Sequence, residues 1–382
     1  MKKIGYLNIV FVFILFFAVS CKKDPVINHN GATDSFSQIF IQFWDKMNYQ
    51  YVYWDKESTD WNLVYKKYKP LFDQLGNSDE DKRKAATYFQ QMTSGLTDNH
   101  FSISFNDGAL SNLTVNPAYD RKIRSENFHS RFNYVEVVKT YLDPGFLSGK
   151  GNITKNGVPI NVTSGTLNNN LLYFHCNFFA LKKSYDSNNT QVKMVLDYFF
   201  SQLKQSTNPI KGVILDLRSN SGGEIIDLNF FAGKLVNKDI TFGYARGKSG
   251  LGKLSYLPWL ESRLKRDPTY ETTIPVILLA DNFSASLAEI MTLALKSPKN
   301  LVIGEQTYGA TGAISDAAIF NSGSFELGNF ASVTTSAVEF KGIDGTFYEN
   351  VGITPDLYVP FNLQELARNK DLQLELAIRQ FK

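Results

Sequence analysis

Residues 274–295, IPVILLADNFSASLAEIMTLAL, place a polar turn between two apolar runs of different periodicity. The first run, IPVILLA, has the length and continuity of a strand that is buried on both faces. The second run repeats its apolar residues at helical spacing and predicts a helix over 287–296. A buried strand that leads directly into a helix is typical of an α/β domain with helices on both faces of its sheet.

The turn of this segment contains two serines, Ser284 and Ser286, at the predicted start of the helix. Free backbone N–H groups and the helix dipole stabilise developing negative charge at such a position. Either hydroxyl is therefore a candidate nucleophile. Serine is also a preferred helix N-cap, so a structural role remains open for each of them from this segment alone.

The same order of strand and helix recurs on both sides of this segment. Apolar strands are predicted at LLYFHCNFF (171–179), GVILDL (212–217) and NLVIG (300–304), and helices at 192–203 and after Gly223. We therefore expect an α/β domain over residues 166–365, followed by a C-terminal helix at 366–382.

A second polar turn follows the strand at 212–217, in the sequence LDLRSNSGG. Its glycines, Gly222 and Gly223, leave room for backbone N–H groups to approach a ligand oxygen, as an oxyanion hole requires. A plain turn between a strand and a helix is the alternative interpretation.

The chain before the α/β domain shows helical periodicity from Phe36, a plausible N-cap at Asp60, and a capping box at Ser78 and Asp81. We expect a small helical domain at 35–98. Residues 99–165 are predicted to hold a strand, FSISF, and then a turn-rich insert that is too short for a confident PDZ assignment.

The N-terminus predicts export. Two lysines precede an apolar run that ends at a small residue, which is typical of a signal peptide at 1–20, although a retained membrane anchor is the alternative. Cys21 follows directly, as in bacterial lipoprotein signals, with Ala18 where leucine is usual. We expect lipidation of Cys21, a tether at 21–34, and a location in the cell envelope, facing the periplasm or the cell surface.

The composition limits the other possibilities. A net charge of +3 without a basic stripe argues against nucleic-acid binding. Cys176 is the one cysteine left after Cys21, and its apolar surroundings predict core packing rather than a disulfide. A catalytic thiol beside His175 is an alternative, but neighbours in a strand point to opposite faces. The four histidines are too scattered to predict a metal site, and no cofactor is expected.

Four motifs stand in one order along the chain: GVILDLRSNSGG (212–223), IPVILLADNFSASLAEIMTLAL (274–295), NLVIGEQTYGATG (300–312) and YENVGITPDLYV (348–359). This order resembles the C-terminal processing, or tail-specific, serine peptidases over roughly residues 35–360. The resemblance implies an α/β fold related to crotonase and the Clp protease. It implies Ser286 as nucleophile with Ser284 as fallback, and an oxyanion hole from the N–H of Leu287 and of Gly222 or Gly223.

One departure from the best-known branch affects the mechanism. Those peptidases activate serine with a lysine, and this chain has Ala310 at that place. The motifs GLTDNHFSI and YENVGITPD resemble instead the branch of the tricorn core and the retinoid-binding-protein-like modules. This second resemblance implies His100 as base and Glu349 as its acid. Asn99 stands where the tricorn core has a serine, and its amide could bridge the two.

Neutral imidazole is a suitable base for a serine hydroxyl near pH 7, and a carboxylate orients the ring and stabilises the imidazolium. Asp98 and Asp344 are rival carboxylates for this role. We therefore expect an exported, lipid-anchored serine endopeptidase that cleaves unfolded or short peptides. A catalytically inactive homologue that binds peptides or a small apolar ligand is the alternative, and the oligomeric state stays open.

Overall fold

The computed structural model describes residues 35–187, 190–204, 209–250, 252–270, 273–314 and 323–381. The predicted signal peptide, Cys21 and the tether lie outside these ranges. Within them, no helix has the length and apolar character that crossing a membrane would require.

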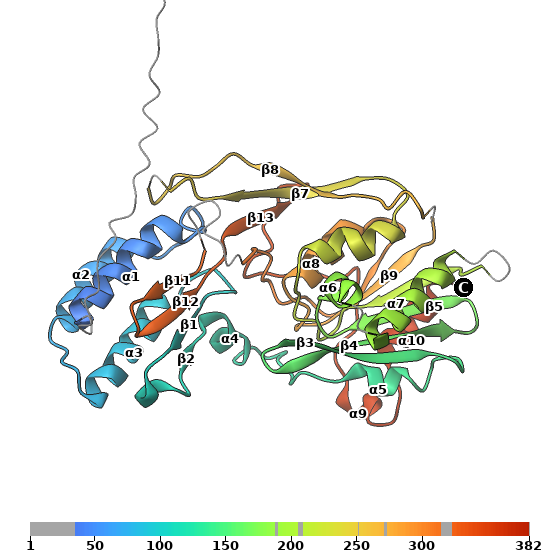
Figure 1. Cartoon of the computed structure of the whole chain (residues 1–382), viewed down its shortest axis with the longest axis horizontal. Coiled ribbons are helices and arrows are strands. Elements are labelled where there is room, and N and C mark those ends of the chain that lie inside the picture. Colours follow the sequence, from blue (N-terminus) through green and yellow to red (C-terminus); the bar gives the residue numbers. More distant parts are fainter. Residues whose placement is uncertain are drawn as a thin grey trace, which may run out of the picture. The chain divides into compact units, whose positions relative to one another are not determined.

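The described strands form three sheets, of which the largest has the order β14-β10-β9-β6-β5-β4-β3 (Figure 1). Its strands are β3 (Leu147–Lys155), β4 (Val158–Leu167), β5 (Leu171–Cys176), β6 (Gly212–Asp216), β9 (Val276–Ala280), β10 (Val302–Gly304) and β14 (Leu357–Tyr358). The five strands from β14 to β5 run parallel, whereas β4 and β3 are antiparallel. The α/β expectation is confirmed, and part of the predicted insert extends the central sheet as β3 and β4.

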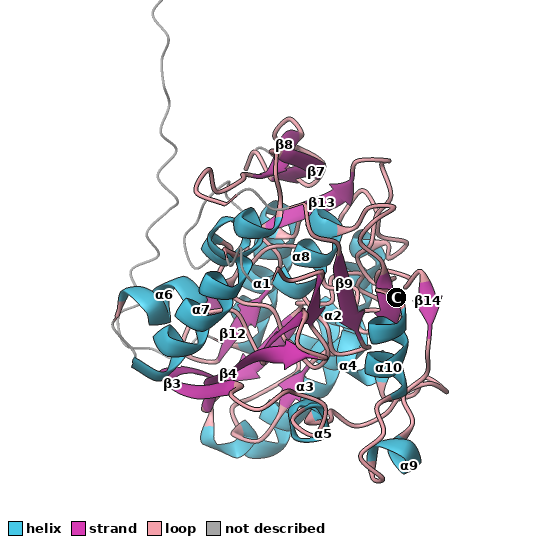
Figure 2. Ribbon diagram, turned by 90° about the vertical axis from the view of Figure 1, so that its right-hand side faces the viewer, coloured by secondary structure: helices cyan, strands magenta, loops and turns pink. Residues whose placement is uncertain are grey.

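Helices cover both faces of this sheet (Figure 2). On one face, a core of alternate strand residues such as Phe174 and Leu215 packs against helices α7 and α8. On the other face, residues such as Tyr173 and Ile214 pack against α5 and α10. The helices of this part are α5 (Tyr134–Val138), α6 (Leu181–Asp186), α7 (Thr190–Leu203), α8 (Leu287–Leu295), α9 (Leu363–Leu366) and α10 (Leu372–Arg379).

A four-stranded sheet, in the order β11-β12-β1-β2, packs against the first three helices. These elements are α1 (Phe36–Gln50), α2 (Trp61–Phe72), α3 (Asp79–Thr93), β1 (Ser102–Phe105), β2 (Thr114–Val115), β11 (Phe325–Leu327) and β12 (Ala331–Thr334). The predicted caps are confirmed, because Asp60 accepts from the N–H groups of Asn62 and Leu63, and Ser78 from that of Asp81.

The core under these helices depends on residues from both ends of the chain. Strand β1 pairs antiparallel with β12, with Ser102 opposite Thr334 (Figure 1). Phe325, Leu327 and Val333 therefore share one buried cluster with α1–α3. The boundaries proposed at residues 98 and 165 stay predictions.

The third sheet has the order β13-β7-β8. Its strands are β7 (Ile240–Gly247), β8 (Leu260–Leu264) and β13 (Val338–Gly342), and the remaining elements are η1 (Gly108–Leu110), α4 (Pro117–Lys122), η2 (Leu228–Ala232) and η3 (Gly233–Leu235). The helix expected after Gly223 is a π-helical turn, η2, continued by the 3₁₀ turn η3.

Candidate active site

Ser286 lies at the N-cap of α8 with φ 57° and ψ −121°. A positive φ is uncommon for a residue other than glycine, and such strain persists only where the surroundings enforce it. The enforcing group is the buried carboxylate of Glu289, which accepts from the N–H groups of Ser286 (3.1 Å), Gly309 (2.7 Å) and Ala310 (2.7 Å). The half-buried Ser286 hydroxyl thus lies at the start of a helix, where Glu289 holds the backbone in place by hydrogen bonds.

Ser284, the other serine of this turn, is buried, and its hydroxyl is already hydrogen-bonded. Its hydroxyl donates to the carbonyl of Leu217 (2.7 Å) and accepts from the N–H of Asp281 (3.0 Å). These two bonds join the end of β6 to the end of β9. The arrangement suits a structural role for Ser284.

Gly222 lies directly against Ser286. A Cβ atom at Gly222 would be 2.5 Å from the Cβ of Ser286 and 2.7 Å from the backbone nitrogen of Leu287. The N–H of Gly222 is engaged with Asn220 Oδ1 (2.8 Å). For the N–H groups of Gly223 and Leu287, no acceptor is found among the described residues. Of the three predicted oxyanion-hole donors, these two are therefore free to bind a ligand oxygen.

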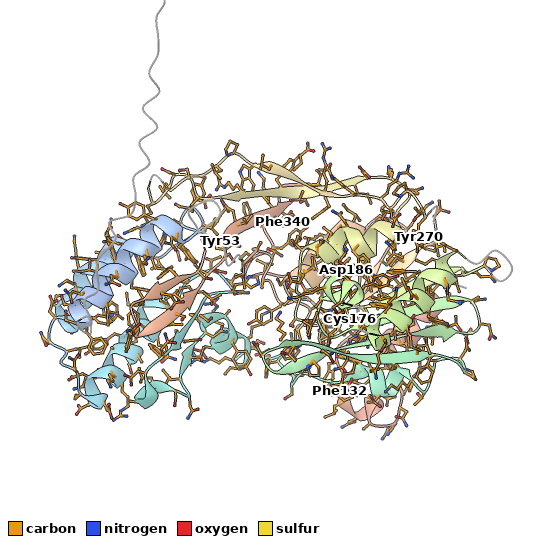
Figure 3. All side chains as sticks on the ribbon, viewed as in Figure 1. Tyr53, Phe132, Cys176, Asp186, Tyr270 and Phe340 are labelled. Carbon is orange, nitrogen blue, oxygen red and sulfur yellow. The ribbon has the colours of Figure 1, made fainter. Side chains whose placement is uncertain are left out.

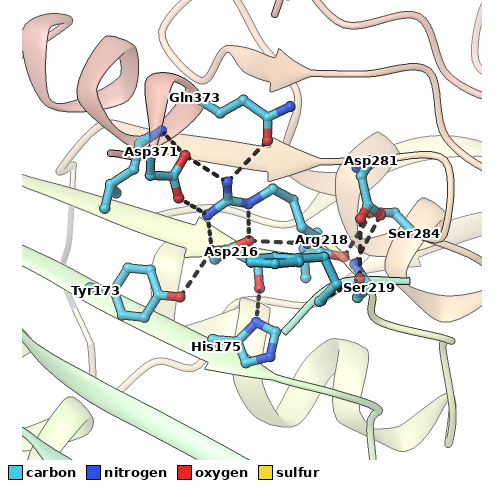
Figure 4. Close-up of polar contacts among 12 residues, drawn as sticks. Tyr173, His175, Asp216, Arg218, Ser219, Asp281, Ser284, Asp371 and Gln373 are labelled. Atoms are coloured by element: carbon cyan, nitrogen blue, oxygen red, sulfur yellow. Dashed lines mark hydrogen bonds and ion pairs between the residues drawn. The ribbon is translucent and has the colours of Figure 1, made fainter. Parts of the chain in front are cut away.

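Buried ion pairs fix the turn that carries these glycines (Figure 4). The guanidinium of Arg218 is fully buried and bonds to Asp216 (2.6 Å), Asp371 (2.9 Å) and Gln373 (3.0 Å). The N–H of the next residue, Ser219, donates to Asp281 (2.9 Å) in the turn before Ser286. The two turns are thus connected to each other and to the C-terminal segment.

His100, Asp98 and Glu349 form one cluster. A ring nitrogen of His100 and one carboxylate oxygen each of Asp98 and Glu349 lie within 4.8 Å of one another. Nδ1 of His100 is 3.4 Å from the hydroxyl of Ser336, which in turn donates to Asp98 Oδ1 (2.8 Å). Asp98 also accepts from the N–H of His100 (2.9 Å). Ser336 therefore links the imidazole to Asp98.

Glu349 is buried and accepts from the N–H groups of Asn99 (2.8 Å), Thr311 (2.7 Å) and Gly312 (2.9 Å). Burial, with repulsion from Asp98, raises the pKa of Glu349 to about 8. These three donors favour the ionised form, in opposition to burial. The same three donors hold the carboxylate beside His100.

Residues 172–359 match the model of peptidase family S41. Over these residues the chain is similar to peptidase family S41. Two curated relatives agree, the carboxy-terminal processing protease CtpA of Bacillus subtilis and a carboxy-terminal-processing protease of Bartonella bacilliformis. They are 28% identical over 148 residues and 29% identical over 174 residues, covering 38% and 45% of this chain. The matches span only 28% and 36% of the relatives' own lengths.

Solved structures agree on the fold. A candidate peptidase from Parabacteroides merdae has a TM-score of 0.69 at 21% identity, covering 91% of this chain and 97% of that one. Mature CPAF has a TM-score of 0.58 at 11% identity, covering 91% and 96%. The predicted resemblance to C-terminal processing peptidases and the predicted fold class are thus confirmed.

One expectation about the site needs correction, and another remains open. The side-chain amide of Asn99 does not bridge His100 and Glu349, because it donates to the carbonyls of Gly309 (2.8 Å) and Tyr308 (3.3 Å). Only the backbone N–H of Asn99 reaches Glu349. In the described part of the chain, no hydrogen bond joins the Ser286 hydroxyl to His100.

The other candidates, which lie within residues 172–359, occupy structural positions. Asp344 is exposed and accepts from the N–H of Thr346 in its own turn (3.0 Å). Cys176 packs in the core beside α6 and α7 (Figure 3), and burial raises the pKa of its thiol well above the usual value. His175, on the other face of β5, bonds through Nδ1 to the carbonyl of Asp216 (3.0 Å). Both residues are therefore poorly placed for nucleophilic catalysis.

Sequence patterns did not single out three residues near this site. Ser336 connects His100 to Asp98, and Arg131 and Lys155 donate to the turn before Gly222. A sequence signal could have found Lys155. The next two residues, Asn156–Gly157, are a preferred two-residue hairpin loop, and both have positive φ in the structure. That signal predicts the β3–β4 hairpin and places Lys155 at its tip.

Proposed function

We propose that the protein is a serine endopeptidase that cleaves unfolded or short peptides, with Ser286 as nucleophile and His100 as base. The observation that carries this proposal is the strained position of Ser286 against Gly222, beside the free N–H groups of Gly223 and Leu287. Strain of this kind concentrates at functional sites. The S41 match supports the same chemistry.

In the proposed mechanism, neutral His100 takes the proton of Ser286 Oγ as that oxygen attacks the substrate carbonyl. The N–H groups of Leu287 and Gly223 stabilise the oxyanion, and the imidazolium then gives its proton to the leaving amine. Asp98 orients the ring through Ser336 and supplies negative charge near it, and Glu349 lies in the same cluster. The Ser286 hydroxyl and His100 must come together when substrate binds, as apo contacts are often loose.

The test compares the purified chain from residue 22 onward with Ser286→Ala and Ser284→Ala, using denatured casein as substrate. We expect the parent and Ser284→Ala to produce fragments, and Ser286→Ala to lose activity by several orders of magnitude. Loss in Ser284→Ala alone, with the fold intact, would move the nucleophile to that residue.

The second candidate function is a catalytically inactive homologue that binds peptides or a small apolar ligand. Two observations favour it. Ala310 stands at the position of the family lysine, and in the described structure the His100 ring is hydrogen-bonded to Ser336 and not to Ser286. Absence of casein cleavage by the folded parent protein would support this function.

The pH dependence tests the base. Burial lowers the pKa of His100, Asp98 partly opposes this shift, and Lys155 adds to it. Because the base must be neutral, kcat/KM should stay high at neutral pH and fall only as pH drops through a value below the ordinary 6.5 or so. The measurement is kcat/KM for a dye-labelled peptide between about pH 4.5 and 8. An acid limb centred above pH 7 would contradict a buried His100 base.

We also propose export to the cell envelope and anchoring through a lipid on Cys21, facing the periplasm or the cell surface. The support is the apolar run before Cys21 and the polar stretch after it. A fatty-acid probe fed to expressing cells should label the natural sequence and not Cys21→Ser. Equal labelling of the two proteins would refute the anchor.

A further inference from the structure

A cavity of about 890 Å³ lies beside the turn that carries Gly222. Its walls come from the β3–β4 hairpin, the segment before α5 and the end of β5, and Ser219 and Ser221 form its border with the turn. This volume is in the range of peptide or ligand sites. The proposed catalytic residues do not line it, so its role is separate from the chemical step.

Two cations connect this cavity to the catalytic turns. Lys155 Nζ donates to the carbonyl of Ser221 (2.7 Å), the residue before Gly222. Arg131 Nη1 donates to the carbonyl of Ser219 (2.8 Å), and its guanidinium lies 4.9 Å from the ring centroid of Phe283. Phe283 precedes Ser286 by three residues. Both cations therefore contact the turn that carries Gly222, and Arg131 also contacts the turn that carries Ser286.

Neither cation has an anionic partner. Among the described residues, no carboxylate lies within 4.0 Å of Arg131 or Lys155, and each donates only to backbone carbonyls. Burial lowers the pKa of Lys155, and repulsion from Arg131 lowers it further. Two like charges that are close enough to repel each other favour the binding of an anion.

The other charged residues of the cavity are also mostly positive. Lys139 and Lys150 also line it, and its one described carboxylate, Glu136, pairs with Lys139 (2.8 Å). The planar guanidinium of Arg131 has further N–H groups, and this geometry suits the two oxygens of a carboxylate.

We propose that Arg131 and Lys155 form a subsite that binds a carboxylate of the peptide substrate, at or next to the scissile bond. This inference rests on the proposed peptidase function. The carboxylate belongs either to an acidic side chain or to the C-terminus of the substrate. Both sources present the same two oxygens to the same two cations.

The first experiment measures binding without cleavage, in the Ser286→Ala background. The probes are four fluorescein-labelled alanine-rich peptides, with central Glu or Gln and with a free or amidated C-terminus. We expect peptides that retain the recognised carboxylate to bind at least about tenfold more tightly than those that lack it. The Glu and Gln pair tests the side-chain source, and the free and amidated pair tests the terminal source.

The variant Arg131→Gln/Lys155→Gln should abolish this preference, and Arg131→Lys/Lys155→Arg should restore most of it if the charge is what matters. Lys182→Gln is the matched control, since Lys182 pairs with Asp186 (2.5 Å) and does not line the cavity. Equal binding of all four peptides, or a preference that survives the double Gln variant, would overturn the subsite.

The same peptides then test cleavage by the natural sequence. A preference in kcat/KM that follows the binding preference supports the subsite and the peptidase together. Carboxylate-dependent binding without cleavage keeps the subsite and rejects the peptidase. Cleavage without any carboxylate preference keeps the peptidase and rejects the subsite.

Discussion

Gly222→Ala should lower kcat/KM by at least about 100-fold while the protein stays folded. The added Cβ would lie 2.5 Å from Ser286 Cβ and 2.7 Å from the carbonyl oxygen of Ala285. Both contacts are with atoms that cannot rotate away, so the nucleophile or the turn must shift. A displacement of about 1 Å at a reacting atom is enough for a loss of this size.

Gly145→Ala is the control for backbone strain. Gly145 also has a positive φ, 97°, but its added Cβ would meet nothing within 4 Å. Both variants should lose some stability from the unfavourable φ, Gly222→Ala more because of its close contacts, and only Gly222→Ala should lose peptide cleavage. Circular dichroism and casein cleavage, measured on both, separate the two effects. More than a tenth of parental activity in Gly222→Ala would mean that Ser286 is not the nucleophile.

Arg218→Met should lower the free energy of unfolding by about 3–5 kcal/mol. The substitution removes the cation from between Asp216 and Asp371, whose side chains are 0% and 1% exposed. Two carboxylates would then remain buried without their charge partner, and this desolvation is the main cost. The turn that carries Gly222 should also lose its fixed position.

Urea unfolding followed by fluorescence measures this effect. The matched control is Arg263→Met, because Arg263 pairs with Glu261 at the surface, where the side chains are 60% and 45% exposed. A surface pair contributes at most about 1 kcal/mol, so the control should unfold close to the parent. Equal unfolding midpoints for Arg218→Met and Arg263→Met would show that the buried network does not stabilise the fold.

Local sequence signals were sufficient for the individual elements of the site. The apolar run before Asp281 and the helical run after Ser286 predicted β9 and α8 closely, because both elements are buried along one chain segment. The caps at Asp60 and Ser78 were equally local. The positive φ of Ser286 was not predictable from its residue type, since it depends on Glu289 and the turn at 309–310.

Local sequence signals could not predict the contacts between distant segments. The link from His100 through Ser336 to Asp98 joins residues more than 200 positions apart, and no periodicity marks Ser336. The sequence resemblance named Glu349 as the acid and Asp98 as a rival, but it could not show that both lie in one cluster or that Ser336 links the ring to Asp98. Lys155 reaches the site only because the β3–β4 hairpin joins the central sheet.

The pairing of β1 with β12 also bears on biosynthesis. His100 adjoins a strand whose partner, Ala331–Thr334, is synthesised more than 200 residues later, and Ser336 and Glu349 follow that partner. A ribosome-bound chain therefore lacks the strand that positions His100, even after Ser286 has emerged. Such late, long-range pairing is slow to form. The growing polypeptide would thus carry Ser286 without a positioned His100 until almost the whole chain had been made.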